Sequence, residues 1–160
     1  VDAERQLRRF GTHHGVRVSI LRAPGIYASD RLPIERLQKG VFALNAEDDV
    51  FTNHIHADDL AMLVCAALRH GRANRCYNAT DDSAMKMGEY FDLVADRFEL
   101  PRAPRIPRSE AQKQMSPLQL SFMSESRRLD NRRIKTELRA QLRFPQVADG
   151  VNAAWHERKL

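Results

Sequence analysis

A β-branched run that stops at a proline and a glycine constrains this chain more than any other feature. Residues 16–20 alternate in the way typical of a half-buried strand. Pro24 and Gly25 then end the strand, because proline removes a backbone donor and glycine accepts dihedrals that other residues avoid. Further along, residues 57–70 repeat apolar side chains at helical spacing. A strand, a loop and an amphipathic helix in this order predict an α/β fold.

The rest of the chain continues this alternation of helices and strands. The patterns predict helices over 2–14, 32–40, 57–70, 84–99, 109–115, 131–142 and 147–159, and strands over 16–23, 50–55 and 75–79. Asp58 or Asp59 is the predicted capping carboxylate of the helix over 57–70. Pro101, Pro104 and Pro107 predict an extended connector, because proline interrupts a helix.

The bulk composition fits a single domain whose cysteines are reduced. With 160 residues, 42% of them hydrophobic, the chain can bury a core. No apolar run approaches the ~18 residues that would span a bilayer, so we expect no membrane partner. Cys65 and Cys76 do not form a disulfide framework, which favours a cytoplasmic setting. The chain starts at Val1 without a methionine, and we therefore expect a truncated or excised piece.

The positive charge is concentrated in one segment. Eleven basic and four acidic residues lie between Arg102 and Arg143, whereas the remaining chain is slightly acidic. Such a segment suits nucleic acid, a small anion or solvent. Aromatic residues for base stacking are scarce there, so we do not expect nucleic-acid binding. One or two of five arginines are predicted to select an anionic substrate instead: Arg102, Arg105, Arg108, Arg127 and Arg128.

Four segments, in this order, resemble the NAD-dependent epimerase/dehydratase family of extended or atypical short-chain dehydrogenases/reductases. They cover residues 21–27 (Leu-Arg-Ala-Pro-Gly-Ile-Tyr), 53–61 (Asn-His-Ile-His-Ala-Asp-Asp-Leu-Ala), 76–82 (Cys-Tyr-Asn-Ala-Thr-Asp-Asp) and 129–151. The resemblance implies the C-terminal half only. It predicts the C-terminal part of a Rossmann-like doubly wound parallel sheet over 1–83, interleaved with a small α/β substrate-binding lobe that occupies most of 84–160.

The family's catalytic signatures are missing from this sequence. No two of its seven glycines have the spacing of a dinucleotide-binding turn. No tyrosine is followed four positions later by lysine, the family's proton-transfer pair. We therefore predict no catalytic residue within the chain and no tight cofactor binding by it. NAD or NADP is expected in the intact protein, together with the missing N-terminal half as a partner; a homodimer stays open.

The resemblance assigns the site to two short segments. It predicts cofactor-facing residues at Ala23, Pro24, Gly25 and Ile26, and substrate-facing residues at Tyr27, Arg31, His54 and His56. Thr52 occupies the position of a phosphate-binding arginine in nucleotide-sugar epimerases, which argues against such a substrate; His54 or Arg31 is the expected substitute. For His56 a structural, hydrogen-bonded role is favoured over catalysis. We do not expect the two histidines to bind a metal.

The functional interpretation that follows is a fragment of an NAD(P)-dependent oxidoreductase or epimerase, which acts by hydride transfer on a small polar substrate. A non-catalytic, dinucleotide-sensing or scaffolding module of the same family is the first alternative. A basic nucleic-acid-binding domain is the second.

Overall fold

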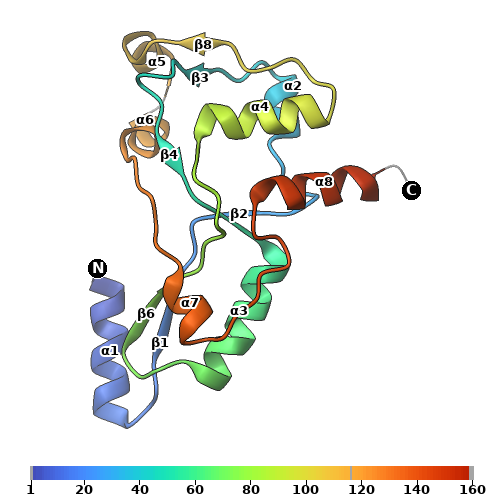
Figure 1. The fold of residues 1–160 in the computed structure, drawn as a ribbon. Coiled ribbons are helices and arrows are strands. Elements are labelled where there is room, and N and C mark those ends of the chain that lie inside the picture. The colour runs from blue at the N-terminus through green and yellow to red at the C-terminus, as the bar shows by residue number, and fades with distance from the viewer. Residues whose placement is uncertain (1, 116, 159–160) are drawn as a thin grey trace.

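The computed structural model describes residues 2–115 and 117–158. Short strands alternate with helices along the whole chain (Figure 1). In order, the elements are α1 (Asp2–His14), β1 (Ser19–Arg22), β2 (Gly25–Tyr27), α2 (Ile34–Gln38), β3 (Ala43–Leu44), β4 (Phe51–Thr52), β5 (His54–His56), α3 (Ala57–His70), β6 (Arg75–Asn78), β7 (Met85–Lys86), α4 (Met87–Arg97), β8 (Arg105–Ile106), α5 (Arg108–Gln114), α6 (Pro117–Ser124), α7 (Arg132–Thr136) and α8 (Val147–Glu157).

The parallel pair β1–β6 organises one end of the molecule. Ser19 pairs with Arg75, and Arg22 with Asn78. Helix α1 lies on one side of this pair and helices α3 and α7 lie on the other (Figure 1). On the α3 side, apolar side chains form a continuous core: Ile55, Leu63, Ala67, Tyr77, Ala79, Ile134, Leu138 and Ala140. The predicted α/β class with a parallel sheet is thereby confirmed.

A second parallel pair, β2–β5, follows the first, because β2 comes shortly after β1 in the sequence. Ile26 pairs with Ile55, and Tyr27 with His56. The sequence predicted a loop here, and that prediction is wrong: after the break at Pro24 the chain turns back into extended backbone and pairs with β5. The pairing matters for function because it places Tyr27 beside the two histidines of β5.

The other end of the molecule is built from α2, α4 and the small pairs β3–β8 and β4–β7 (Figure 1). Helix α8 packs against α4 and β5 and so joins this part to the strand pair β2–β5. Its core is separate from the first and includes Tyr27, Leu37, Phe91, Val94 and Val151. The predicted division of the chain near residue 83 stays a prediction.

Several predicted elements are shorter or divided. The strand predicted over 50–55 is split at Asn53 into β4 and β5, which pair with different partners. The helix predicted over 131–142 stops after Thr136. Arg139 has a positive φ of +56°, which does not occur in a right-handed helix. For the last predicted helix, residue 159 lies outside the described residues. No helix within the described ranges is long and apolar enough to cross a bilayer.

Candidate functional site

A cavity of about 360 Å³ opens between β2, the start of α2, the β4–β5 segment and α4. We call it the Tyr27 cavity. Its walls are Gly25, Ile26, Tyr27, Arg31, Leu32, Pro33, Glu35, Arg36, Thr52, His54, Met87, Tyr90 and Phe91. Five of the eight predicted site residues therefore meet here, although they come from two separate segments of the sequence.

The three other predicted residues do not line this cavity. Ala23 and Pro24 lie in the short connection between β1 and β2. His56 caps helix α3, because its Nδ1 accepts a hydrogen bond from the backbone N–H of Asp58 at 3.2 Å. Its ring packs on Phe144, with the ring centroids 4.1 Å apart. The contacts of His56 are those of a structural histidine, the role favoured from the sequence.

His54 is the most unusual group of the Tyr27 cavity. Its side chain is buried, its ring lies 4.3 Å from that of Tyr90, and its Nδ1 has no hydrogen-bond partner among the described residues. Burial lowers the pKa of His54 to about 4, since water no longer stabilises the imidazolium. His54 is therefore neutral at physiological pH. A neutral imidazole offers a ligand one hydrogen-bond donor and one acceptor, but no positive charge for a phosphate.

Tyr27 presents a second unsatisfied group. It is 2% exposed, and its hydroxyl forms no hydrogen bond within residues 2–115 and 117–158. Burial, followed by the nearby Asp81 carboxyl, raises its pKa, so the hydroxyl stays protonated. Gly150 of α8 makes room for this ring, because a Cβ at that position would lie 2.5 Å from the hydroxyl oxygen. Buried polar atoms without partners are costly, which is typical of positions that a ligand or water completes.

Asp81 is a buried acid in the segment 76–82, which the sequence showed only as part of the family resemblance. One carboxyl oxygen accepts the backbone N–H of Ser83 at 2.9 Å, as turn chemistry requires, whereas Oδ2 has no partner in the described part of the chain. Its own N–H donates to the His54 carbonyl at 2.8 Å. Burial raises the pKa of Asp81 to about 7. The Asp81-Asp82 pair in the sequence was the available signal, but nothing in it showed which acid is buried.

Asp59 has a different role from the one predicted. Its carboxylate does not cap α3; it accepts the backbone N–H groups of Arg143 at 2.8 Å and Phe144 at 2.9 Å. The cap belongs to His56, one residue before the helix. The prediction that Asp58 or Asp59 caps this helix is therefore wrong. His56 accepts one N–H group of the first turn, and both carboxylate oxygens of Asp59 bind the distant segment 143–144 instead.

Other walls of the cavity come from helices whose role sequence analysis did not foresee. Tyr90 and Phe91 of α4 supply aromatic surfaces, and the Arg36 guanidinium lies 5.2 Å above the Phe91 ring. Arg31 is well exposed, and its one ion pair among the described residues is a long contact, 3.8 Å, with Asp30. Two cationic side chains beside aromatic walls suit a ligand that combines an anionic group with a flat apolar face.

The arginines predicted to select an anionic substrate lie elsewhere. None of the five lines the Tyr27 cavity. Four of them form ion pairs within the chain: Arg102 with Asp96, Arg105 with Asp92, Arg108 with Asp48 and Arg127 with Glu125. Arg128 lies over the Phe51 ring at 5.4 Å. No group of three or more potential metal-binding side chains occurs in the ranges that the structure covers.

Comparison with known proteins places this fold. No family model matches the sequence, and no curated protein is significantly similar to it. Among solved structures, a functionally unknown conserved protein from Silicibacter pomeroyi is 24% identical with a TM-score of 0.84; the match covers 96% of this chain and 53% of that one. A nucleoside-diphosphate-sugar epimerase from Pseudomonas aeruginosa is 17% identical with a TM-score of 0.76, covering 99% and 53%.

A human epimerase family protein solved with NADPH is 15% identical, with a TM-score of 0.72 and coverage of 88% and 49%. The chain thus spans about half the length of these structures. The resemblance seen in the sequence is confirmed as a likeness of fold: this chain has the fold of about half of an NAD-dependent epimerase/dehydratase protein.

Proposed function

We propose that this chain is the second half of an NAD(P)-dependent oxidoreductase or epimerase and that it contributes the substrate cleft. One observation carries the proposal: the Tyr27 cavity joins residues from β2, α2, β5 and α4 in a fold that matches half of solved epimerases. The substrate would be a small polar molecule with an anionic group, held in a cytoplasmic enzyme.

The residues of the cavity divide the binding of such a substrate between them. Arg31 and Arg36 attract the anionic group at the mouth. Tyr90 covers an apolar face of the substrate, the Tyr27 ring closes the cavity, and His54 offers a buried nitrogen that lacks a partner within the described chain. Because His54 is neutral, it selects a hydroxyl or carbonyl group rather than a phosphate. Arg31 is then the substitute for the arginine that Thr52 replaces.

This chain offers a surface for only one end of the dinucleotide. In the intact protein NAD or NADP would supply hydride transfer. At the start of β2 the backbone of Gly25 and Ile26 is exposed, and a Cβ on Gly25 would crowd the Asn53 carbonyl oxygen, at 3.2 Å. No glycine-rich turn before a helix exists in the sequence to cradle a pyrophosphate. The residues present therefore do not fit the whole cofactor.

The sheet leaves room for the rest of such a fold. Strand β1 pairs with β6 along one edge, and its other edge has no strand partner in residues 2–115 and 117–158. Nearby, Leu7 and Phe10 of α1 are about half exposed, at 50% and 53%. A partner that adds a parallel strand to β1 would satisfy this edge and complete the sheet.

An NMR titration of the 160-residue chain tests the proposal. With glucose 1-phosphate as the probe, we expect the largest shift changes at residues 25–31 and 87–91. Arg31→Gln should weaken binding about tenfold, the loss expected for one charge-assisted contact, and Arg69→Gln on an exposed turn of α3 should leave it unchanged. NADPH should show no binding tighter than about 100 μM. Shift changes confined to other surfaces, or an unaltered affinity in Arg31→Gln, would refute the assignment.

The same family fold also allows a non-catalytic, dinucleotide-sensing module. Turnover measured on the intact polypeptide that carries this chain separates the two: a sensor would bind the dinucleotide without converting a substrate. For the nucleic-acid alternative we expect only weak DNA binding that disappears at moderate salt.

A further inference from the structure

A second cavity, of about 480 Å³, lies at the far edge of the β1–β6 pair and is separate from the Tyr27 cavity. We call it the Arg133 cavity. Its walls are Arg22, Cys76, Asn78, Asp130, Arg132, Arg133 and Thr136. Three of these seven side chains are guanidinium groups, and they come from two elements, the end of β1 and helix α7. Nothing in the proposed oxidoreductase function uses this surface.

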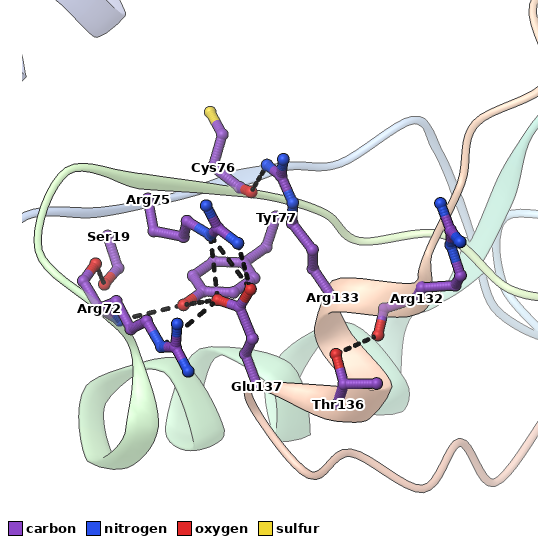
Figure 2. A network of polar contacts seen from close by, with 9 residues as sticks. All are labelled: Ser19, Arg72, Arg75, Cys76, Tyr77, Arg132, Arg133, Thr136 and Glu137. Atoms are coloured by element: carbon purple, nitrogen blue, oxygen red, sulfur yellow. Dashed lines mark hydrogen bonds and ion pairs between the residues drawn. The ribbon is translucent and has the colours of Figure 1, made fainter.

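Helix α7 is held in place by its buried neighbours. Ile134 and Leu138 are buried in the core beneath the sheet. Glu137 receives hydrogen bonds from the Arg75 guanidinium and from the Tyr77 hydroxyl, and a backbone N–H of Arg72 donates to that same hydroxyl at 3.0 Å. Figure 2 shows this network on the side of β6 that faces α7; the Cys76 thiol points to the other side, and the Arg133 guanidinium reaches from α7 to the Cys76 carbonyl. The short helix is therefore anchored, and its charges are presented by a rigid support.

The guanidinium groups are only partly used by the protein. Arg22 binds Glu4 through Nε and Nη2, at 2.7 and 2.8 Å, which leaves Nη1. Arg132 binds Asp130 through Nε at 2.7 Å. Arg133 donates from Nη1 to the Cys76 carbonyl at 3.1 Å and forms no ion pair with any described residue. Its Nε and Nη2 have no hydrogen-bond partner within residues 2–115 and 117–158.

The charges around the cavity leave it positive. Arg8 also lies next to the Arg133 cavity: it donates a hydrogen bond to the Cys76 sulfur at 3.4 Å and contacts Glu4 at 3.6 Å. Four arginines thus face two acids, Glu4 and Asp130. Hydrogen bonding from Arg22 holds the pKa of Glu4 at about 2, and the Arg132 backbone N–H lowers that of Asp130, so both acids stay ionised. Two positive charges are left over.

We propose that the Arg133 cavity binds the phosphate or pyrophosphate group of a small molecule. Planar guanidinium forks match phosphate oxygens in pairs, and Arg133 offers free donors with no carboxylate to displace. Arg132 and Arg22 provide the remaining N–H groups, and the thiol of Cys76 lies in the same wall. The site is independent of the Tyr27 cavity, so each proposal stands or fails alone.

Calorimetric titration of the 160-residue chain with inorganic pyrophosphate tests this site. Arg133→Gln should weaken pyrophosphate binding about tenfold, and the added change Arg132→Gln should remove measurable binding. The matched control is Arg127→Gln, which removes the same charge from an exposed arginine outside the cavity and should change the affinity less than twofold. Succinate should bind far more weakly than pyrophosphate.

A second readout locates the ligand and does not depend on affinity alone. In a Cys65→Ser background Cys76 is the sole cysteine. Pyrophosphate should then slow its alkylation by iodoacetamide in proportion to occupancy, and Arg31→Gln should not alter that protection. The proposal is overturned if pyrophosphate does not bind at millimolar concentration, if Arg127→Gln weakens it as much as Arg133→Gln, if succinate binds equally well, or if alkylation is unaffected.

Discussion

Replacing Asp59 by asparagine separates two roles that look alike in the sequence. As a helix cap, Asp59 would lose little on this change, because an asparagine oxygen also accepts a backbone N–H. As the structure has it, both carboxylate oxygens are occupied, by the N–H groups of Arg143 and Phe144, and the residue is 2% exposed. Asparagine keeps one acceptor and turns an NH₂ group towards the second N–H.

The magnitude follows from those two hydrogen bonds. A hydrogen bond to a charged group contributes about 1.5–3 kcal/mol, and a buried donor left without a partner costs a comparable amount. We expect Asp59→Asn to lower the free energy of unfolding by about 2–3 kcal/mol, and Asp59→Ala by about 3–5 kcal/mol. The control is Asp58→Asn, an exposed acid whose contact with Arg143 at 3.6 Å should be worth less than about 1 kcal/mol.

Urea denaturation followed by the fluorescence of Trp155, the one tryptophan, measures these differences. Its ring packs on Phe98, with the ring centroids 5.4 Å apart, so unfolding changes its surroundings. If Asp59→Asn costs no more than Asp58→Asn, the two hydrogen bonds do not anchor the segment and the reasoning fails.

Four further predictions concern the Tyr27 cavity and the open sheet. Between about pH 4 and 7 native Asp81 keeps a proton that the unfolded chain loses, so this group lowers stability as the pH rises; Asp81→Asn should abolish that decline, which is at most about 1.4 kcal/mol per pH unit. His54 acts in the opposite sense, because its lowered pKa removes stability as the pH falls from 6.5 towards 4, and His54→Phe should remove that loss in denaturation measured across the same range. Gly150→Ala should destabilise the fold by about 1–3 kcal/mol through its clash with the Tyr27 ring, and an equal effect of Asn152→Ala, on an exposed position of α8, would contradict this. The isolated chain should self-associate through the free edge of β1, and a concentration-independent monomer in analytical ultracentrifugation would argue against that.

Local patterns were sufficient for the long helices. Helices α1 and α3 begin and end at the predicted residues, Asp2–His14 and Ala57–His70, because apolar spacing, first-turn acids and a following glycine are all local signals. Strands of two or three residues carry no comparable signal. Pairs such as β3–β8 exist because distant segments meet, and a window of a few residues contains no trace of the partner.

For the candidate site, too, short motifs were predictable from the sequence, whereas contacts between distant residues were not. The motifs around Tyr27 and His54 were recognisable because their residue types and order are unusual. Tyr90 lies within the predicted helix over 84–99, but a core tyrosine and a cavity wall have the same helical spacing, so its place in the cavity was not predictable. For Asp59 the decisive partner lies 84 positions away in the sequence, and no cap preference reveals it.

The two hydrogen bonds of Asp59 also link the stability of the fold to the geometry of the Tyr27 cavity. The segment that it holds, residues 143–144, leads directly into α8, whose first turn is fixed by a hydrogen bond from the Val147 N–H to Ser83 Oγ at 2.7 Å. Gly150 in that helix then packs on the Tyr27 ring. The last helix of the chain therefore sets the position of a hydroxyl on its second strand, and a substitution at Asp59 that leaves the protein folded should still displace Tyr27 and weaken ligand binding in the cavity.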